Sequence, residues 1–161
     1  MSIPALPAQL NPPLTGREAI TDALSRFLIA LDTADEGLFT SSLAPTASLT
    51  INGDITSGLQ DILSLRFSLI GKLDTTHHAT NLRINISEDG KTAQATASML
   101  SQHYRNGEGM TGPGKESMLL GNVIGVEFVR DEEGGQGEFW RIQSFVLQSN
   151  WAEGAWGVLS S

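Results

Sequence analysis

The chain has 161 residues, with ten lysines and arginines against eighteen aspartates and glutamates, which gives a net charge of −8. A net negative charge repels nucleic-acid phosphates and acidic lipid headgroups, so neither nucleic acid nor a membrane is expected as a partner. The sequence contains no cysteine, which excludes disulfide bonds, thiolate nucleophiles and cysteine-bound zinc or iron–sulfur sites.

The N-terminal segment, residues 1–14, contains four prolines and no basic stretch, so it predicts an extended arm and not a signal or transit peptide. No later apolar run approaches the ~18 residues of a membrane span. Residues 15–161 show neither an internal repeat nor a linker. We therefore expect a cytoplasmic protein with one domain over residues 15–161.

Helical spacing dominates the first half of the chain after this arm. Thr15 and Glu18 match a capping box, and the apolar residues between 16 and 33 recur at helical intervals. A shorter helix is predicted over 35–43 and a third over 59–71.

The second half changes to the alternation and β-branched residues that are typical of strands. Short turns rich in glycine separate these segments, which favours antiparallel hairpins. Strands are predicted over 79–86, 93–105, 117–130 and 139–151, after a short one over 47–52. This order indicates the α+β class: a cone-shaped, curved, mixed or antiparallel sheet whose three to four N-terminal helices enclose a pocket.

The three histidines are candidate acid–base groups. His77 and His78 lie at the start of the first long strand, and His103 lies in the next one. A hairpin turn around residues 88–90 brings residues 77 and 78 level with residues 101–104, so two imidazoles can meet across neighbouring strands. Alternation allows only one of His77 and His78 to share a face with His103. Histidine gives and takes protons near neutral pH, which predicts an acid and a base in one cavity.

Asp32 ends the apolar face of the first predicted helix, close to a predicted chain reversal. It is either a solvated helix-end carboxylate or an acid that orients a histidine. Histidines adjacent in sequence rarely bind one ion together, and no aspartate or glutamate stands at a short fixed spacing from them. We therefore expect no metal ion and no other cofactor.

Four segments of the chain carry a family resemblance: LDTADEGLFTSSLAPT, TTHHATNLRINISEDGKTAQATA, SQHYRNGEG and FWRIQSFVLQSNWAEG. In order and spacing they resemble the scytalone dehydratase-like (SnoaL-like) family of the nuclear transport factor 2-like superfamily. The resemblance covers nearly the whole chain after residue 15. It implies a cone-shaped fold with a small-molecule pocket inside.

The resemblance also implies candidate catalytic residues. It places the family's helix-end aspartate on Asp32 and the second-strand histidine, which that aspartate holds by a hydrogen bond, on His103. The family's first-strand histidine falls on His77 or His78. An asparagine four residues further on, Asn81, favours His77, whereas the spacing of 25 residues to His103 favours His78.

The substrate-binding groups depart from those of the family's namesake. Leu31 and Ile51 stand where the namesake enzyme has two tyrosines that help to activate a carbonyl. Its polar residues of the fourth strand fall near Val123 and Gly125. Scytalone is therefore not the expected substrate, and a more apolar or differently oriented polycyclic compound fits these changes better.

The predicted function is a cofactor-independent acid–base lyase or isomerase: a dehydratase, double-bond isomerase or cyclase acting on a small polycyclic polyketide or terpenoid intermediate. One histidine would remove a proton next to a carbonyl and a second, protonated one would assist, with Asp32 holding His103. Tyr104 and Asn122 are candidates for orienting the substrate. The alternative is a non-catalytic ligand-binding module, or a partner subunit like the β subunit of ring-hydroxylating dioxygenases. The resemblance implies a homo-oligomer, a dimer or trimer, in either case.

Overall fold

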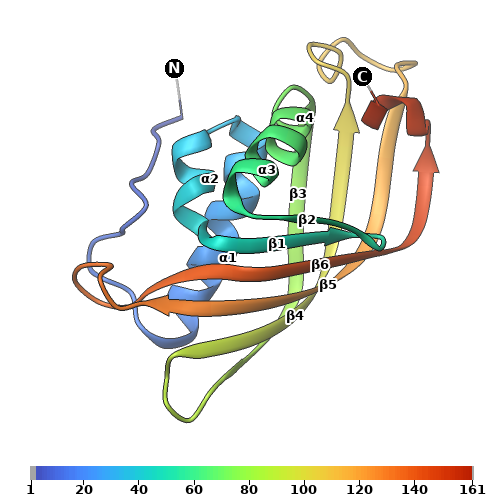
Figure 1. The fold of residues 1–161 in the computed structure, drawn as a ribbon. Helices are drawn as coiled ribbons and strands as arrows, with labels where there is room; N and C mark the ends of the chain where they lie inside the picture. The colour runs from blue at the N-terminus through green and yellow to red at the C-terminus, as the bar shows by residue number, and fades with distance from the viewer. Residues whose placement is uncertain (1–2, 161) are drawn as a thin grey trace.

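The computed structural model describes residues 3–160, in which helices pack on the inner face of one strongly bent sheet (Figure 1). The strands follow one another across the sheet as β2 (Asp54–Ser57), β1 (Leu43–Ile51), β6 (Phe139–Gly154), β5 (Ser117–Asp131), β4 (Thr92–Tyr104) and β3 (Asp74–Ile86). β1 and β6 run parallel, and the other described pairs are antiparallel. This mixed, curved sheet confirms the predicted α+β cone. Residues 1, 2 and 161 of the predicted arm and domain lie outside the described residues.

Helix α1 (Gly16–Thr33) has the predicted bounds, but the predicted capping box is wrong. The Thr15 side chain makes no capping hydrogen bond, and the backbone N–H of Gly16 donates to Glu138 Oε2 at 3.1 Å. A carboxylate from the residue just before β6 therefore supplies the acceptor that local sequence was expected to provide. At the other end, Ala34 is left-handed (φ 53°) and stops the helix two residues after Asp32.

Helix α2 (Glu36–Ser42) is capped by the preceding Asp35, whose side chain accepts a hydrogen bond from the backbone N–H of Leu38 at 2.9 Å. β1 follows at once and starts four residues before its predicted position. Pro45 lies inside it, within an irregular stretch of its pairing with β6, where the missing N–H of proline breaks no regular ladder.

The third predicted helix is a helical segment of three parts: α3 (Leu59–Ile62), the wider π-helical turn η1 (Leu63–Phe67) and α4 (Ser68–Ile70). The short strand β2 was not predicted. It pairs with β1 through a tight turn at Asn52 and Gly53, both of which have positive φ.

The long strands β3 to β6 match the four predicted ones: β3 begins five residues earlier and β6 ends three residues later than predicted, and the other ends agree within one residue. β3 begins at Asp74, so both His77 and His78 lie inside the sheet, opposite Ser101 and Leu100 of β4. Around Asn81, which is left-handed (φ 55°), the pairing of β3 with β4 shifts by one residue. This β-bulge changes which side chains of β3 face the helices.

The apolar core lies between α1 and the sheet, where the Phe27 ring stacks on Phe39 and lies tilted against Phe145, each pair with ring centroids 5.0 Å apart. The C-terminal turn η2 (Trp156–Ser160) folds back beside β4 and β5 (Figure 1) and buries Val158 against Met118 and Leu120. Across residues 3–160, no helix has the length and apolar character needed to cross a membrane.

Candidate active site

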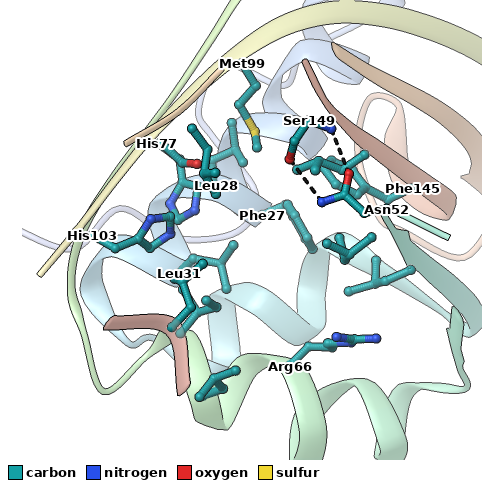
Figure 2. A pocket seen from close by; sticks show the side chains of 18 of the residues that line it. Phe27, Leu28, Leu31, Asn52, Arg66, His77, Met99, His103, Phe145 and Ser149 are labelled. Atoms are coloured by element: carbon teal, nitrogen blue, oxygen red, sulfur yellow. Dashed lines mark hydrogen bonds between the residues drawn. The ribbon is translucent and has the colours of Figure 1, made fainter. Parts of the chain in front are cut away.

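A cavity of about 300 Å³ lies between α1, the helical segment 59–70 and the inner face of the sheet (Figure 2). Most of its wall is apolar, and polar side chains gather at a few places on it. The apolar lining includes Phe27, Leu28, Leu31, Phe39, Leu49, Ile51, Met99, Leu120, Phe145 and Leu147. Such a wall suits a small, largely apolar ligand that is oriented by few polar groups.

Asp32 and His77 form a close pair at this cavity. The backbone N–H of His77 donates to Asp32 Oδ2 at 2.9 Å, and its ring Nδ1 lies 2.6 Å from Asp32 Oδ1. Because a carboxylate only accepts, the ring hydrogen of neutral His77 belongs on Nδ1, which leaves the lone pair on Nε2. Asp32 thus fixes both the position and the tautomer of His77.

His103 is the second imidazole of the site, 5.3 Å from the His77 ring between centroids and nearly perpendicular to it. It is 3% exposed, and its Nδ1 lies 3.4 Å from the carbonyl oxygen of Met118. Burial, and next the nearby charge of His77, lower the pKa of His103 to about 4, although the Met118 carbonyl and Asp32 act in the opposite direction. His103 is therefore neutral at pH 7.

The expected contact between Asp32 and His103 is wrong, because His77 takes that place. His103 lies opposite Thr75 in the sheet, two residues before His77 on β3, and the end of α1 packs on β3. The carboxylate at the end of α1 therefore reaches His77 first. The expectation of a protonated second histidine is also at odds with the lowered pKa of His103.

The bulge in β3 explains why His77 and not His78 faces the cavity. Below the bulge, Arg83 lies opposite Thr96, and continuing this register would place His78 opposite Ser101, on the face of His103. The extra residue at Asn81 moves His77 to that position. His78 is exposed on the outer face of the sheet.

The predicted substrate-binding residues divide into three groups. Leu31 and Ile51 line the cavity. Tyr104 is half-buried, alternates with His103 and does not contribute to the lining. Asn122 faces inward but is covered, at 4% exposure, by the residues around it.

Val123 and Gly125, near which the resemblance placed polar residues of the namesake enzyme, do not line the cavity. Val123 is 45% exposed, and the inward positions of β5 are the even-numbered ones, Asn122 and Ile124 among them. A one-residue shift along a strand moves a side chain to the other face of the sheet.

Sequence reasoning missed four polar residues of the lining: Asn52, Arg66, Ser101 and Ser149. Ser101 alternates with His103 along β4, so its inward orientation was within reach of the pattern. Asn52 was interpreted only as the last residue of a short strand. Arg66 donates to Thr56 Oγ1 at 2.8 Å and to Asp54 Oδ2 at 2.7 Å, and lies away from the two histidines (Figure 2).

The arrangement supplies an imidazole whose Nε2 has no hydrogen-bond partner among residues 3–160, a carboxylate that can stabilise the positive charge formed when that imidazole takes a proton, and an apolar space beside them. Among residues 3–160, no group of three or more histidine, aspartate and glutamate side chains is placed to hold a metal ion.

Comparison with known proteins agrees with this fold. Residues 12–146 match the family model described as "SnoaL-like domain". The chain is 47% identical over 158 residues to terrestric acid biosynthesis cluster protein E from Penicillium crustosum, covering 98% of each chain.

Two crystal structures show the same fold at low identity. A hexachlorocyclohexane dehydrochlorinase, LinA-type3 from Novosphingobium barchaimii, is 23% identical with a TM-score of 0.69, over 88% of this chain and 91% of that one. A putative scytalone dehydratase from Novosphingobium aromaticivorans is 14% identical with a TM-score of 0.71, over 86% and 87%. The family model and the Penicillium relative together establish that the chain belongs to the SnoaL-like family.

Proposed function

We propose that the protein is an acid–base lyase or isomerase of secondary metabolism, in which His77 removes a proton from a carbon next to a carbonyl group. The observation that carries this proposal is the Asp32–His77 pair, joined at 2.6 Å and open to an apolar cavity. The similarity to a biosynthesis cluster protein over 98% of the chain supports a place in secondary metabolism.

In the proposed step, the substrate C–H proton moves to Nε2 of neutral His77, and the bond's electron pair forms an enolate whose negative charge rests on the carbonyl oxygen. Asp32 stabilises the resulting imidazolium, as the carboxylate does in a catalytic triad. The imidazolium then returns the proton. Return to a departing hydroxyl gives water and a dehydrated product, whereas return to another carbon gives a double-bond isomer. Attack of the enolate carbon on a second carbonyl closes a ring and forms an alkoxide, which then takes the proton from the imidazolium.

His103, the second histidine of the site, does not take the role of the protonated partner that the predicted mechanism required beside the base. With its pKa lowered to about 4 and its Nδ1 facing the Met118 carbonyl, it offers Nε2 as a hydrogen-bond acceptor. We propose that it accepts a hydrogen bond from a substrate hydroxyl or from protonated His77. In this proposal, His77 alone takes up the substrate proton and returns it.

The substrate class follows from the cavity wall. A volume of about 300 Å³ lies at the small end of the range for ligand pockets. Leu31 and Ile51 present only apolar atoms. A compact polyketide or terpenoid intermediate with an acidic C–H beside a carbonyl meets these constraints.

Hydrogen–deuterium exchange tests this function without knowledge of the final product. Candidate ketones are incubated with the protein in D₂O, and deuterium at the carbon next to the carbonyl is followed by mass spectrometry. Asp32→Asn and His77→Gln should slow exchange by about 10³-fold, because they remove the orienting acid and the base. His78→Gln, a change one residue away on the outer face, is the matched control and should exchange like the wild type.

Equal exchange rates in the wild type and in Asp32→Asn would contradict the function. The alternative of a partner subunit predicts a filled or shallow cone, and the cavity argues against it. A non-catalytic binding module would also have a cavity, and equal exchange rates in these variants would support it.

We further propose, as the resemblance implied, that the protein forms a homo-oligomer through the outer sheet face. Leu100, Val123 and Val146 are 44–46% exposed there on three neighbouring strands. Light scattering of the wild type and of a Val123→Lys variant measures this: the variant should have the smaller mass.

A further inference from the structure

One wall of the cavity carries a row of polar side chains that the proposed proton transfer does not use. The row runs from Asn52 through Ser149 of β6 and Asn122 of β5 to Ser101 of β4, and it ends opposite His77. Figure 2 shows the two hydrogen bonds that join Asn52 and Ser149, across the pocket from the histidines. Backbone N–H and carbonyl groups beside this row determine which partner donates in each of its hydrogen bonds.

The direction starts at Asn52. The backbone N–H of Ser149 can only donate, and it lies 2.7 Å from Asn52 Oδ1. The amide nitrogen of Asn52 therefore faces the Ser149 hydroxyl and donates to it at 3.0 Å. The Ser149 hydroxyl in turn donates to Asn122 Oδ1 at 2.8 Å.

The backbone also fixes the amide of Asn122. Its nitrogen lies 3.3 Å from the Met99 carbonyl and 3.4 Å from the Leu120 carbonyl, and carbonyl groups only accept. The same nitrogen lies 3.4 Å from Ser101 Oγ. An amide nitrogen has no lone pair to share, so Ser101 cannot donate to it. No acceptor for the Ser101 hydroxyl hydrogen is found within residues 3–160, and Ser101 lines the cavity.

We propose that Ser101 donates this hydrogen to the carbonyl oxygen of the substrate and stabilises the negative charge that forms there. This inference rests on the proposed function, because it assigns the oxygen of the enolate that His77 creates. Ser101 and His77 are direct partners across β3 and β4, a geometry in which Cβ atoms lie about 5 Å apart. Their side chains can therefore reach the oxygen and the neighbouring carbon of one ketone. A fixed donor in an apolar site is a strong stabiliser of an oxyanion.

The inference identifies a ligand class, namely planar compounds with an anionic or strongly polarised oxygen. Binding of para-nitrophenolate, whose oxygen imitates that of an enolate, tests it against para-nitrotoluene, which lacks the oxygen. Ser101→Ala should weaken binding of the phenolate about 10- to 100-fold, the range for one hydrogen bond to a charged group, and leave binding of nitrotoluene within about threefold. Ser101→Thr keeps the hydroxyl and should keep most of the phenolate affinity.

Ser149 and Asn122 are positioning residues in this account, since they act through Ser101. Ser149→Ala removes the donor to Asn122 Oδ1 and leaves the Met99 and Leu120 carbonyls alone to hold that amide, so it should weaken phenolate binding about threefold without changing nitrotoluene binding. Ser149→Thr restores the donor and should restore the phenolate affinity. A purely structural role would lower both affinities together.

The binding experiment separates failure of this inference from failure of the proposed function. If the wild type binds no phenolate, or binds it no more tightly than Ser101→Ala does, the inference is overturned whatever the deuterium exchange shows. If Ser101→Ala loses phenolate affinity but Asp32→Asn keeps the wild-type exchange rate, the oxyanion site stands and the proposed base is wrong.

Discussion

Helix α1 carries two carboxylates, ten residues apart, that each bind a basic side chain. The two pairs differ in how many nitrogens of the basic side chain are hydrogen-bonded. Near the start of β6, Arg26 donates to Asp22 at 2.9 Å, to the Ser41 carbonyl at 2.6 Å and to the Trp140 carbonyl at 2.7 Å. All three nitrogens of its guanidinium are engaged. At the end of the helix, Asp32 engages one ring nitrogen of His77 and leaves the other beside a cavity.

The difference separates structural from functional polar groups. Burial lowers the pKa of Arg26, which is 4% exposed, while its contact with Asp22 acts in the opposite direction. Its hydrogen bonds tie α1 to the carbonyls of α2 and β6, and it packs over the ring of Phe139 at 4.2 Å. A buried polar group with full hydrogen bonding stabilises a fold, whereas one with an unused atom at a cavity can act on a ligand.

The largest effect is expected when Arg26 of the Asp22–Arg26 pair is replaced. Arg26→Met should lower the free energy of unfolding by about 4 kcal/mol, because it removes the ion pair with Asp22 and the donor to the buried Trp140 carbonyl, and leaves the Ser41 carbonyl with the Arg141 donor alone. Denaturant titration measures the loss, and deuterium exchange per folded molecule should stay at the wild-type level. A variant as stable as the wild type would show that these contacts contribute little.

The next effect is a pH dependence of stability that arises from His103, beside the Asp32–His77 pair. His103 has a pKa of about 4 when folded and an ordinary value of 6.5, so the unfolded chain binds its proton first as the pH falls. Its contribution to stability is complete above pH 6.5 and is lost as the pH falls to about 4, a total of roughly 3 kcal/mol. Unfolding of the wild type and of His103→Leu across this window isolates the effect, since other acids titrate in both. Parallel curves would contradict the buried, neutral state of His103.

A smaller effect is expected at the β-bulge of β3, which determines whether His77 or His78 faces the cavity. Asn81→Val places a β-branched residue at φ 55° and should cost about 1–2 kcal/mol, whereas Asn81→Gly should cost little. If Asn81→Val restores regular pairing, the inward histidine changes and deuterium exchange falls with it. A Val variant that matches the Gly variant in stability and in exchange would argue against a role for the bulge.

Sequence reasoning succeeded where the pattern is local. The apolar spacing of residues 16–33 gave the bounds of α1, and alternation with short turns located the four long strands. The hairpin turn also predicted that two histidines of neighbouring strands meet in one cavity, because the turn fixes the register of the two strands to within a few residues.

It failed where one element meets another that is distant in the chain. A single extra residue at Asn81 decides between His77 and His78, and the docking of α1 on β3 decides which imidazole Asp32 reaches. The cap of α1 comes from Glu138, more than a hundred residues away. The Ser101 donor depends on amide orientations that three backbone groups impose, which no periodicity encodes.

The central claim, that Asp32 holds His77 as the base while His103 stays neutral, can be measured without a substrate. Nitrogen NMR of the histidine side chains across pH, assigned with a His78→Gln variant, reports the tautomer and the protonation of each ring. We predict that neutral His77 carries its hydrogen on Nδ1, that this resonance shifts in Asp32→Asn, and that His103 takes up a proton only near pH 4. A His77 ring with its hydrogen on Nε2, or a His103 that titrates near 6.5, would contradict the account.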